Sequence, residues 1–142
     1  MADFVAWFAS LVLAGLGGLH YYWAFGGKAG ARAAVPDRPD GEPLFRLGKP
    51  ATLTVGTMLL AAGALLLAHR GLLPLGLSET WTQWGCLLGG AVFLIRTVGD
   101  FKYVGFFKKV RGTAFAASDT KLYSPLCLLL AASFAISALA PL

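Results

Sequence analysis

The chain has 142 residues, of which 57% are hydrophobic and only 13% charged, and it carries a formal net charge of +5. A soluble domain carries about 25% charged residues, so this composition excludes an ordinary soluble domain and predicts one membrane domain over 1–142. The basic residues flank the apolar blocks and form no continuous stripe, which argues against nucleic acid as a partner.

Four apolar blocks are long enough to cross a bilayer, because about 20 helical residues cover about 30 Å of hydrocarbon. Lipid offers the backbone no hydrogen-bond partners, and four strands cannot close a barrel, so the blocks must be helices. The fold class expected is an all-α membrane protein, an antiparallel bundle of four transmembrane helices. The helices are expected at 4–25, 51–69, 81–99 and 124–141, with a first loop at 26–50 and a third loop at 100–123.

The first block is predicted to be a membrane span and not a secretory signal. Asp3 precedes it without any Lys or Arg, whereas a signal peptide begins with a basic segment. The small pair Ala14 and Gly18 lies four residues apart in this block, a spacing that favours close helix contact.

The distribution of Lys and Arg predicts the orientation. Eleven of the 12 basic residues lie in or beside the first and third loops, and Arg70 in the short second turn is the exception. The positive-inside rule therefore puts both long loops in the cytoplasm and both termini outside. The expected location is a bacterial inner membrane.

Gly85 and Gly89 form a GxxxG motif in the third block. Such motifs let two helices approach closely, either within one chain or between two copies. Both intramolecular packing and a homodimer through the Gly85/Gly89 face are open on this pattern.

The third loop contains VGFFKKVRGTAF (104–115), in which aromatic and basic pairs alternate. One interpretation is a solvated loop. The other is a segment in the headgroup region, with Lys108, Lys109 and Arg111 on lipid phosphates. The fourth block is expected to begin at Ser124 and Pro125, which match an N-cap residue followed by proline at the first helical position.

Polar side chains gather toward the expected cytoplasmic ends of the helices, whereas the outer halves are almost purely apolar. Ionisable groups at membrane depth are costly and are therefore candidates for function. A pocket that opens to the cytoplasm or the inner leaflet would use them. The candidate ligand-binding residues are His20, Arg96, Asp100, Tyr103, Asp119 and Tyr123.

Arg96 and Asp100 are spaced to share a helical face, and Tyr103 would extend it. The pair is either a structural ion pair or a site that holds an anionic or carbonyl group. Asp119 is either a capping carboxylate or a partner of Arg96 or of a lysine in the third loop.

Other chemistry finds little support. His20 could transfer protons but has no second ligand at metal spacing, and His69 is expected only to mark the outer interface. Cys86 and Cys127 form no CxxC motif and are expected at different depths. No phosphate-binding loop or dinucleotide fingerprint occurs, so we expect neither metal nor cofactor.

Three segments resemble a bacterial family of four-helix integral membrane proteins that is catalogued as a domain of unknown function. They are HYYWAFGG (20–27), RTVGDFKYVGFFKKVRGTAF (96–115) and DTKLYSPLCL (119–128). The resemblance implies a small single-domain inner-membrane protein and brings no reaction. Its segments include Arg96, Gly99, Asp100, Tyr103, Gly105, Asp119, Tyr123 and Pro125.

Three functions remain open on the sequence. The first is binding of a lipid or lipophilic ligand in a cytoplasm-facing pocket, with membrane lipids as partners. The second is a small membrane enzyme, an isomerase or reductase, with His20 and Asp100 or Asp119 as proton-transfer groups. The third is a dimeric small-molecule transporter, so the sequence does not decide whether the protein is an enzyme.

Overall fold

A computed structural model describes residues 1–46 and 48–142, and its regular structure is helical. Three of the expected helices lie within two residues of their expected bounds. The elements are α1 (Ala2–Ala24), η1 (Arg32–Ala34), α2 (Lys49–His69), α3 (Glu79–Val98), α4 (Ala114–Ser118), η2 (Asp119–Tyr123) and α5 (Ser124–Leu139).

Three helical stretches of the described chain are long and apolar enough to cross a membrane. They are α1, α2 and the continuous stretch Ala114–Leu139, which joins α4, η2 and α5. This is the pattern of a multi-pass membrane protein. A fourth crossing by α3, which carries Glu79, Thr82, Gln83 and Arg96 among its residues, stays a prediction.

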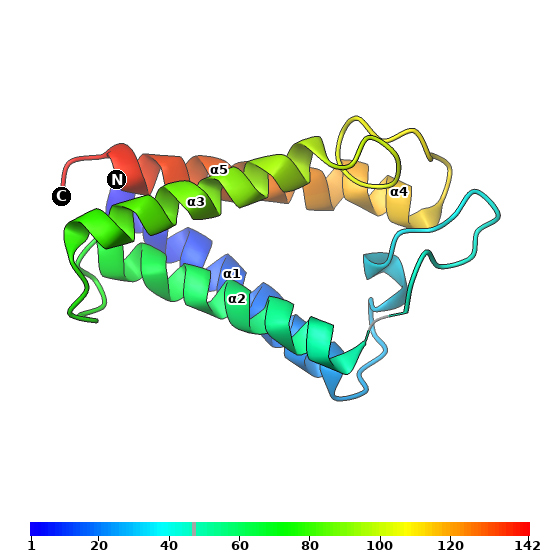
Figure 1. The fold of residues 1–142 in the computed structure, drawn as a ribbon, viewed down its shortest axis with the longest axis horizontal. Helices are drawn as coiled ribbons and strands as arrows, with labels where there is room; N and C mark the ends of the chain where they lie inside the picture. Colours follow the sequence, from blue (N-terminus) through cyan, green and yellow to red (C-terminus); the bar gives the residue numbers. More distant parts are fainter. Residues whose placement is uncertain (47) are drawn as a thin grey trace.

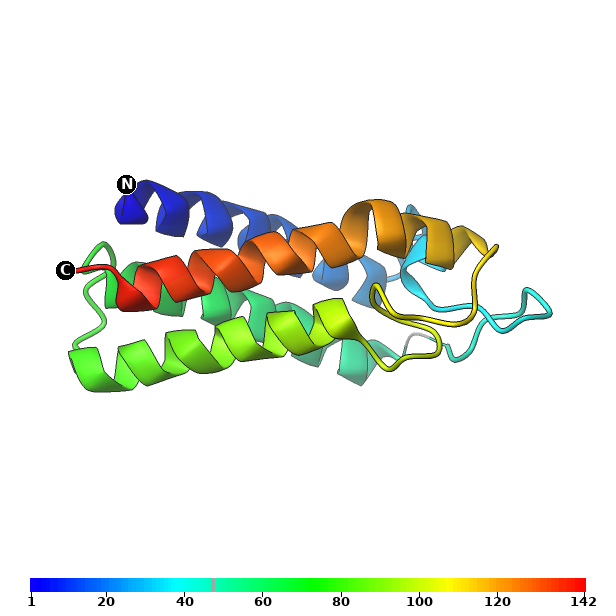
Figure 2. The ribbon, with the colours of Figure 1, turned by 90° about the horizontal axis from the view of Figure 1, so that it is seen from above.

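The long helices form two closely packed pairs, α1 with α2 and α3 with α5 (Figure 1). The pairs meet at the end that holds both chain termini and diverge toward the end that holds the first and third loops. Figure 2, seen from above, shows the same two ends. We refer to them as the terminal end and the loop end.

Glycines bring α1 and α2 close together. A Cβ atom at Gly17 would lie 3.0 Å from the Gly56 carbonyl oxygen, so the two backbones nearly touch there. Ser10 also donates a 2.9 Å hydrogen bond to the Gly63 carbonyl. Ala14 and Gly18 make no such contact within the chain, since both residues are exposed, and a contact between two copies through this pair stays a prediction.

The GxxxG motif of α3 packs inside the chain. A Cβ at Gly85 would lie 2.7 Å from Leu65 of α2, and one at Gly89 would lie 2.7 Å from Phe134 of α5. Intramolecular packing therefore accounts for this motif. A homodimer through the Gly85/Gly89 face would have to compete with these contacts.

The terminal end contains the apolar core, and Arg70 links the helix ends there by hydrogen bonds. The core consists of Ala9, Leu13, Leu66, Cys86, Leu130, Phe134 and Ala138. Arg70 donates to Asp3 Oδ1 at 2.7 Å and to the carbonyls of Ala140 and Pro141 at 3.2 and 3.0 Å. One side chain thus joins α1, α2 and the carbonyl end of α5, where a cation is favourable.

The last helix begins ten residues before its expected start. Thr113 caps it by accepting the Ala116 N–H at 3.1 Å, so Ser124 is not the N-cap. Pro125 lies inside the helix, directly after the π-helical turn η2. A proline ring clashes with the carbonyl four residues earlier in a regular helix, and the wider π turn accommodates it.

Candidate functional site

The third loop is held by a close backbone crossing at its start. Gly99 and Gly105 have φ angles of +84° and +86°, and a Cβ at Gly105 would lie 2.3 Å from the Val98 carbonyl oxygen. Only glycine fits both the angles and the space. After the crossing, the chain runs back toward α3, and the Phe106 backbone N–H donates a 2.9 Å hydrogen bond to the Thr97 carbonyl, which closes the turn.

Asp100 stabilises this turn from outside the helix. Its Oδ1 accepts the backbone N–H groups of Lys102, Tyr103 and Val104 at 2.8–3.0 Å. Burial raises the pKa of Asp100, but the three N–H donors outweigh burial and hold that pKa below its usual value. Asp100 is therefore a capping carboxylate for the loop.

The expected Arg96–Asp100 ion pair is wrong. The spacing places both residues on one face only if the helix continues, and α3 ends at Val98 because Gly99 turns the chain away. Arg96 instead pairs with Asp119. Arg96 was one of the two partners predicted for Asp119. The Nη2–Oδ1 distance is 2.8 Å.

Asp119 is the centre of a buried ionic cluster at the loop end. Its side chain is fully buried, and its Oδ2 accepts from Lys108 Nζ at 3.0 Å and from the Gly105 N–H at 2.9 Å. Lys108 Nζ also donates to the Gly105 carbonyl and to Thr120 Oγ1. The cluster thus ties α3, the third loop and η2 together.

Lys108 cannot contact lipid phosphates as expected, because its side chain is only 1% exposed and its ammonium has three protein acceptors. Its burial next to two exposed neighbours, Phe107 and Lys109, carried no sequence signal. Lys109 and Arg111 are exposed and keep the headgroup role as a prediction. The Arg111 guanidinium also donates to the carbonyls of Lys108 and Phe106.

The remaining candidates lie apart from this cluster. His20 belongs to the α1–α2 pair, where its Nδ1 contacts the Leu16 carbonyl at 2.7 Å. Tyr103 lies under the Lys102 ammonium, 5.1 Å from ring centre to Nζ. Tyr123 donates a 3.0 Å bond to the Ala33 carbonyl and so connects η2 to the first loop.

A second polar group was missed at the terminal end. His69 was expected at the interface, but it is 4% exposed and its Nδ1 contacts Thr82 Oγ1 at 3.0 Å. Ser137 on α5 is fully buried nearby in the same end of the bundle. The position of Thr82 in its helix gave no sequence signal for this contact between α2 and α3.

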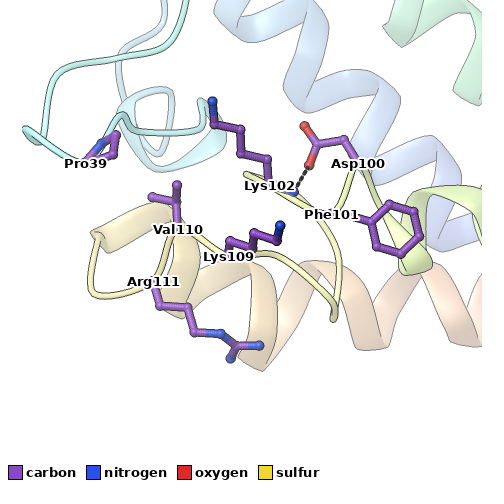
Figure 3. Close-up of a pocket in the computed structure, with 7 residues that line it drawn as sticks. All are labelled: Pro39, Asp100, Phe101, Lys102, Lys109, Val110 and Arg111. Atoms are coloured by element: carbon purple, nitrogen blue, oxygen red, sulfur yellow. Dashed lines mark hydrogen bonds between the residues drawn. The ribbon is translucent and has the colours of Figure 1, made fainter.

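A cavity of about 680 Å³ opens between the tip of the first loop and the third loop. In Figure 3 the Lys109 side chain extends toward Phe101, the Lys102 side chain extends toward the first loop, and Arg111 is turned away. Asp100 is the one acidic residue of the lining, and its Oδ1 is occupied by backbone donors. The cavity therefore favours an anion. Its lining consists of Pro39, Asp100, Phe101, Lys102, Lys109, Val110 and Arg111.

No group of three or more His, Cys, Asp or Glu side chains in residues 1–46 and 48–142 is placed to hold a metal ion. The two cysteines are free, with Cys86 buried and Cys127 half-buried.

Comparison with known families identifies the chain. Residues 13–134 match the family described as protein of unknown function (DUF3995), so the chain belongs to that family. The match covers all three segments on which the resemblance rested. No curated protein and no solved structure matches the chain.

Proposed function

We propose that this protein is a four-helix protein of the bacterial cytoplasmic membrane that binds the headgroup of an anionic phospholipid in the cavity between its first and third loops. In this proposal the loop end faces the cytoplasm and the terminal end faces outward. The charge distribution supports that orientation, because eleven of the 12 Lys and Arg residues belong to the loop end.

The observation that carries the proposal is the pairing of exposed lysines with exposed aromatic rings at one cavity. Lys102 and Lys109 are exposed in the lining, and Phe101 and Phe107 beside them are 57% and 62% exposed. The two rings contact each other, with centroids 6.3 Å apart. Ammonium groups suit a lipid phosphate, and aromatic rings suit the boundary with the acyl chains.

The size of the cavity agrees with a headgroup ligand. Ligand sites commonly occupy about 300–1,000 Å³, and this cavity measures about 680 Å³. It is open at the loop end, so a lipid can enter without unfolding the bundle. The family match gives no competing activity.

The test uses native mass spectrometry of the detergent-purified protein with added phosphatidylglycerol, an anionic lipid, or phosphatidylcholine, a zwitterionic one. We expect the wild type to retain phosphatidylglycerol preferentially. The double variant Lys102→Gln/Lys109→Gln should lose about thirtyfold in affinity, because each lysine near anionic lipid contributes about 1 kcal/mol.

The matched control is Lys28→Gln/Lys121→Gln, which removes the same charge from exposed positions outside the cavity lining. This control should retain phosphatidylglycerol like the wild type. Equal losses in both double variants would mean that only net charge matters, and the cavity would then not be the site.

A further inference from the structure

The buried cluster at the loop end holds two cations against one carboxylate. Asp119 is fully buried, and Lys108, whose side chain is 1% exposed, already neutralises it. Arg96 is therefore the surplus charge of the cluster. Its side chain is 32% exposed, so it alone of the three can be reached from outside.

Arg96 also has unused hydrogen-bonding capacity. A guanidinium has five N–H donors, and the described contact of this one is a single bond from Nη2 to Asp119. Nη1 is enclosed and has no partner within 1–46 and 48–142, and the same holds for the fully buried Ser124 hydroxyl on α5. Buried donors without acceptors are rare and call for a partner.

The surroundings of Arg96 select the kind of partner. Arg96 lies in the last turn of α3, and Val92, one turn earlier, and the adjacent Ile95 are 56% and 69% exposed. α3 packs against α5, on which Cys127 is half-buried. An anion bound here would have apolar side chains around it, which favours an amphiphile over a soluble ion.

We propose that Arg96 binds the carboxylate of a single-chain lipophilic acid, of the long-chain fatty acid class, at a site separate from the phospholipid cavity. One surplus positive charge matches a monoanion, and the planar guanidinium fork matches a carboxylate. Lys108 keeps Asp119 neutralised while Arg96 turns its free donors to the ligand. The hydrocarbon chain lies along the exposed apolar flank of α3.

The test measures oleate binding to the detergent-purified full chain by native mass spectrometry, with oleyl alcohol as the uncharged analogue. We expect one oleate bound to the wild type and no retained oleyl alcohol. Arg96→Gln should weaken oleate binding about tenfold or more, because a charge-assisted hydrogen bond is lost. Oleate bound equally by wild type and Arg96→Gln would overturn the proposal, and so would equal retention of the alcohol.

A second measurement needs no variant and covers the case in which Arg96→Gln does not fold. Cys86 is fully buried and Cys127 only half-buried, so N-ethylmaleimide should alkylate Cys127 faster. Oleate should slow this alkylation several-fold, while oleyl alcohol should not. An alkylation rate unchanged by oleate would contradict the site.

The two proposals can fail separately. Lys102→Gln/Lys109→Gln should keep oleate binding, and Arg96→Gln should keep the preference for phosphatidylglycerol. Oleate binding that is lost with the lysine pair and kept without Arg96 would assign the acid to the loop cavity and remove the separate site.

Discussion

The two ends of the bundle each hold an arginine against an aspartate, and they do so in opposite ways. At the terminal end, Arg70 is 8% exposed and directs its donors to Asp3 and two helix-end carbonyls, whereas Asp3 is 55% exposed. At the loop end the carboxylate Asp119 is buried, whereas Arg96 is 32% exposed and its Nη1 has no hydrogen-bond partner in the part of the chain that the structure describes.

This difference indicates that Arg70 has a structural role and that Arg96 can bind a ligand. Arg70 directs its Nε and Nη1 donors to three protein acceptors, so its contacts stabilise the fold. Arg96 shares its carboxylate with Lys108, so the protein can keep Asp119 neutralised without it. Substitutions at the terminal end should therefore change stability alone, and those at the loop end should divide between stability and binding.

The largest effect is expected from Asp119→Asn. The amide leaves the Lys108 ammonium buried without a counter-ion, and breaking a buried pair costs about 3–5 kcal/mol. Denaturant unfolding in mixed micelles measures this loss in the free energy of unfolding. Asp40→Asn, at an exposed carboxylate of the first loop, is the control and should change it by less than about 0.5 kcal/mol.

Gly105→Ala should have the next largest effect and lower the free energy of unfolding by about 2–4 kcal/mol. The new methyl group would meet the Val98 carbonyl, and residue 105 has a positive φ. Gly112→Ala separates the two causes, since Gly112 also has φ +84° but open space around it. It should cost only the strain, about 1 kcal/mol. Equal losses would show that the backbone crossing is not tight.

Arg70→Gln should cost about 1–2 kcal/mol, because it removes bonds to two carbonyls and a largely exposed aspartate. Oleate and phosphatidylglycerol binding should stay at wild-type levels in the same preparation. If Arg70→Gln remains folded and loses binding, then Arg70 contributes to ligand binding at the loop end, and the two arginines do not have separate roles.

The smallest effect concerns Asp100 and pH. Because its pKa is lowered in the fold, its stabilisation is present above the ordinary carboxyl pKa and is lost as pH falls through the lowered value. Hydrogen exchange of the Tyr103 and Val104 amides, corrected for intrinsic rates, should accelerate below about pH 4.

The Phe106 amide, which bonds to a carbonyl and not to Asp100, is the internal control and should change less. Asp100→Ala should make exchange at Tyr103 and Val104 fast at every pH. Protection at these two amides that does not vary with pH in the wild type would remove Asp100 from the loop's support.

The sequence predicted the structure where hydrophobic pattern along the chain determines it. It did not predict the contacts that depend on the tertiary path of the third loop. The long apolar blocks predicted α1, α2 and α3 to within two residues, because lipid forces such blocks into helices. The same logic misplaced the start of the last helix, since Ser124 and Pro125 are typical of an N-terminus and here follow a π turn.

The ionic cluster could be predicted only in part. Helical spacing suggested Arg96 with Asp100, but Gly99 ends the helix between them, and a glycine in a left-handed conformation is not visible as such in a single sequence. Asp119 was expected to pair with Arg96 or a lysine of the third loop, and it pairs with both. Burial of Lys108 depends on the tertiary path of the loop, so its exposed neighbours gave no hint of it.

The most direct test compares Lys108→Gln with Arg96→Gln in one denaturant titration of the full chain in mixed micelles. If Lys108 is the structural counter-ion and Arg96 the surplus cation, the lysine variant should lose at least about twice as much free energy of unfolding. Lys108 is 1% exposed and donates to three protein acceptors, whereas Arg96 is 32% exposed and donates one bond to Asp119. Losses of equal size, or a larger loss for Arg96→Gln, would contradict this division of roles.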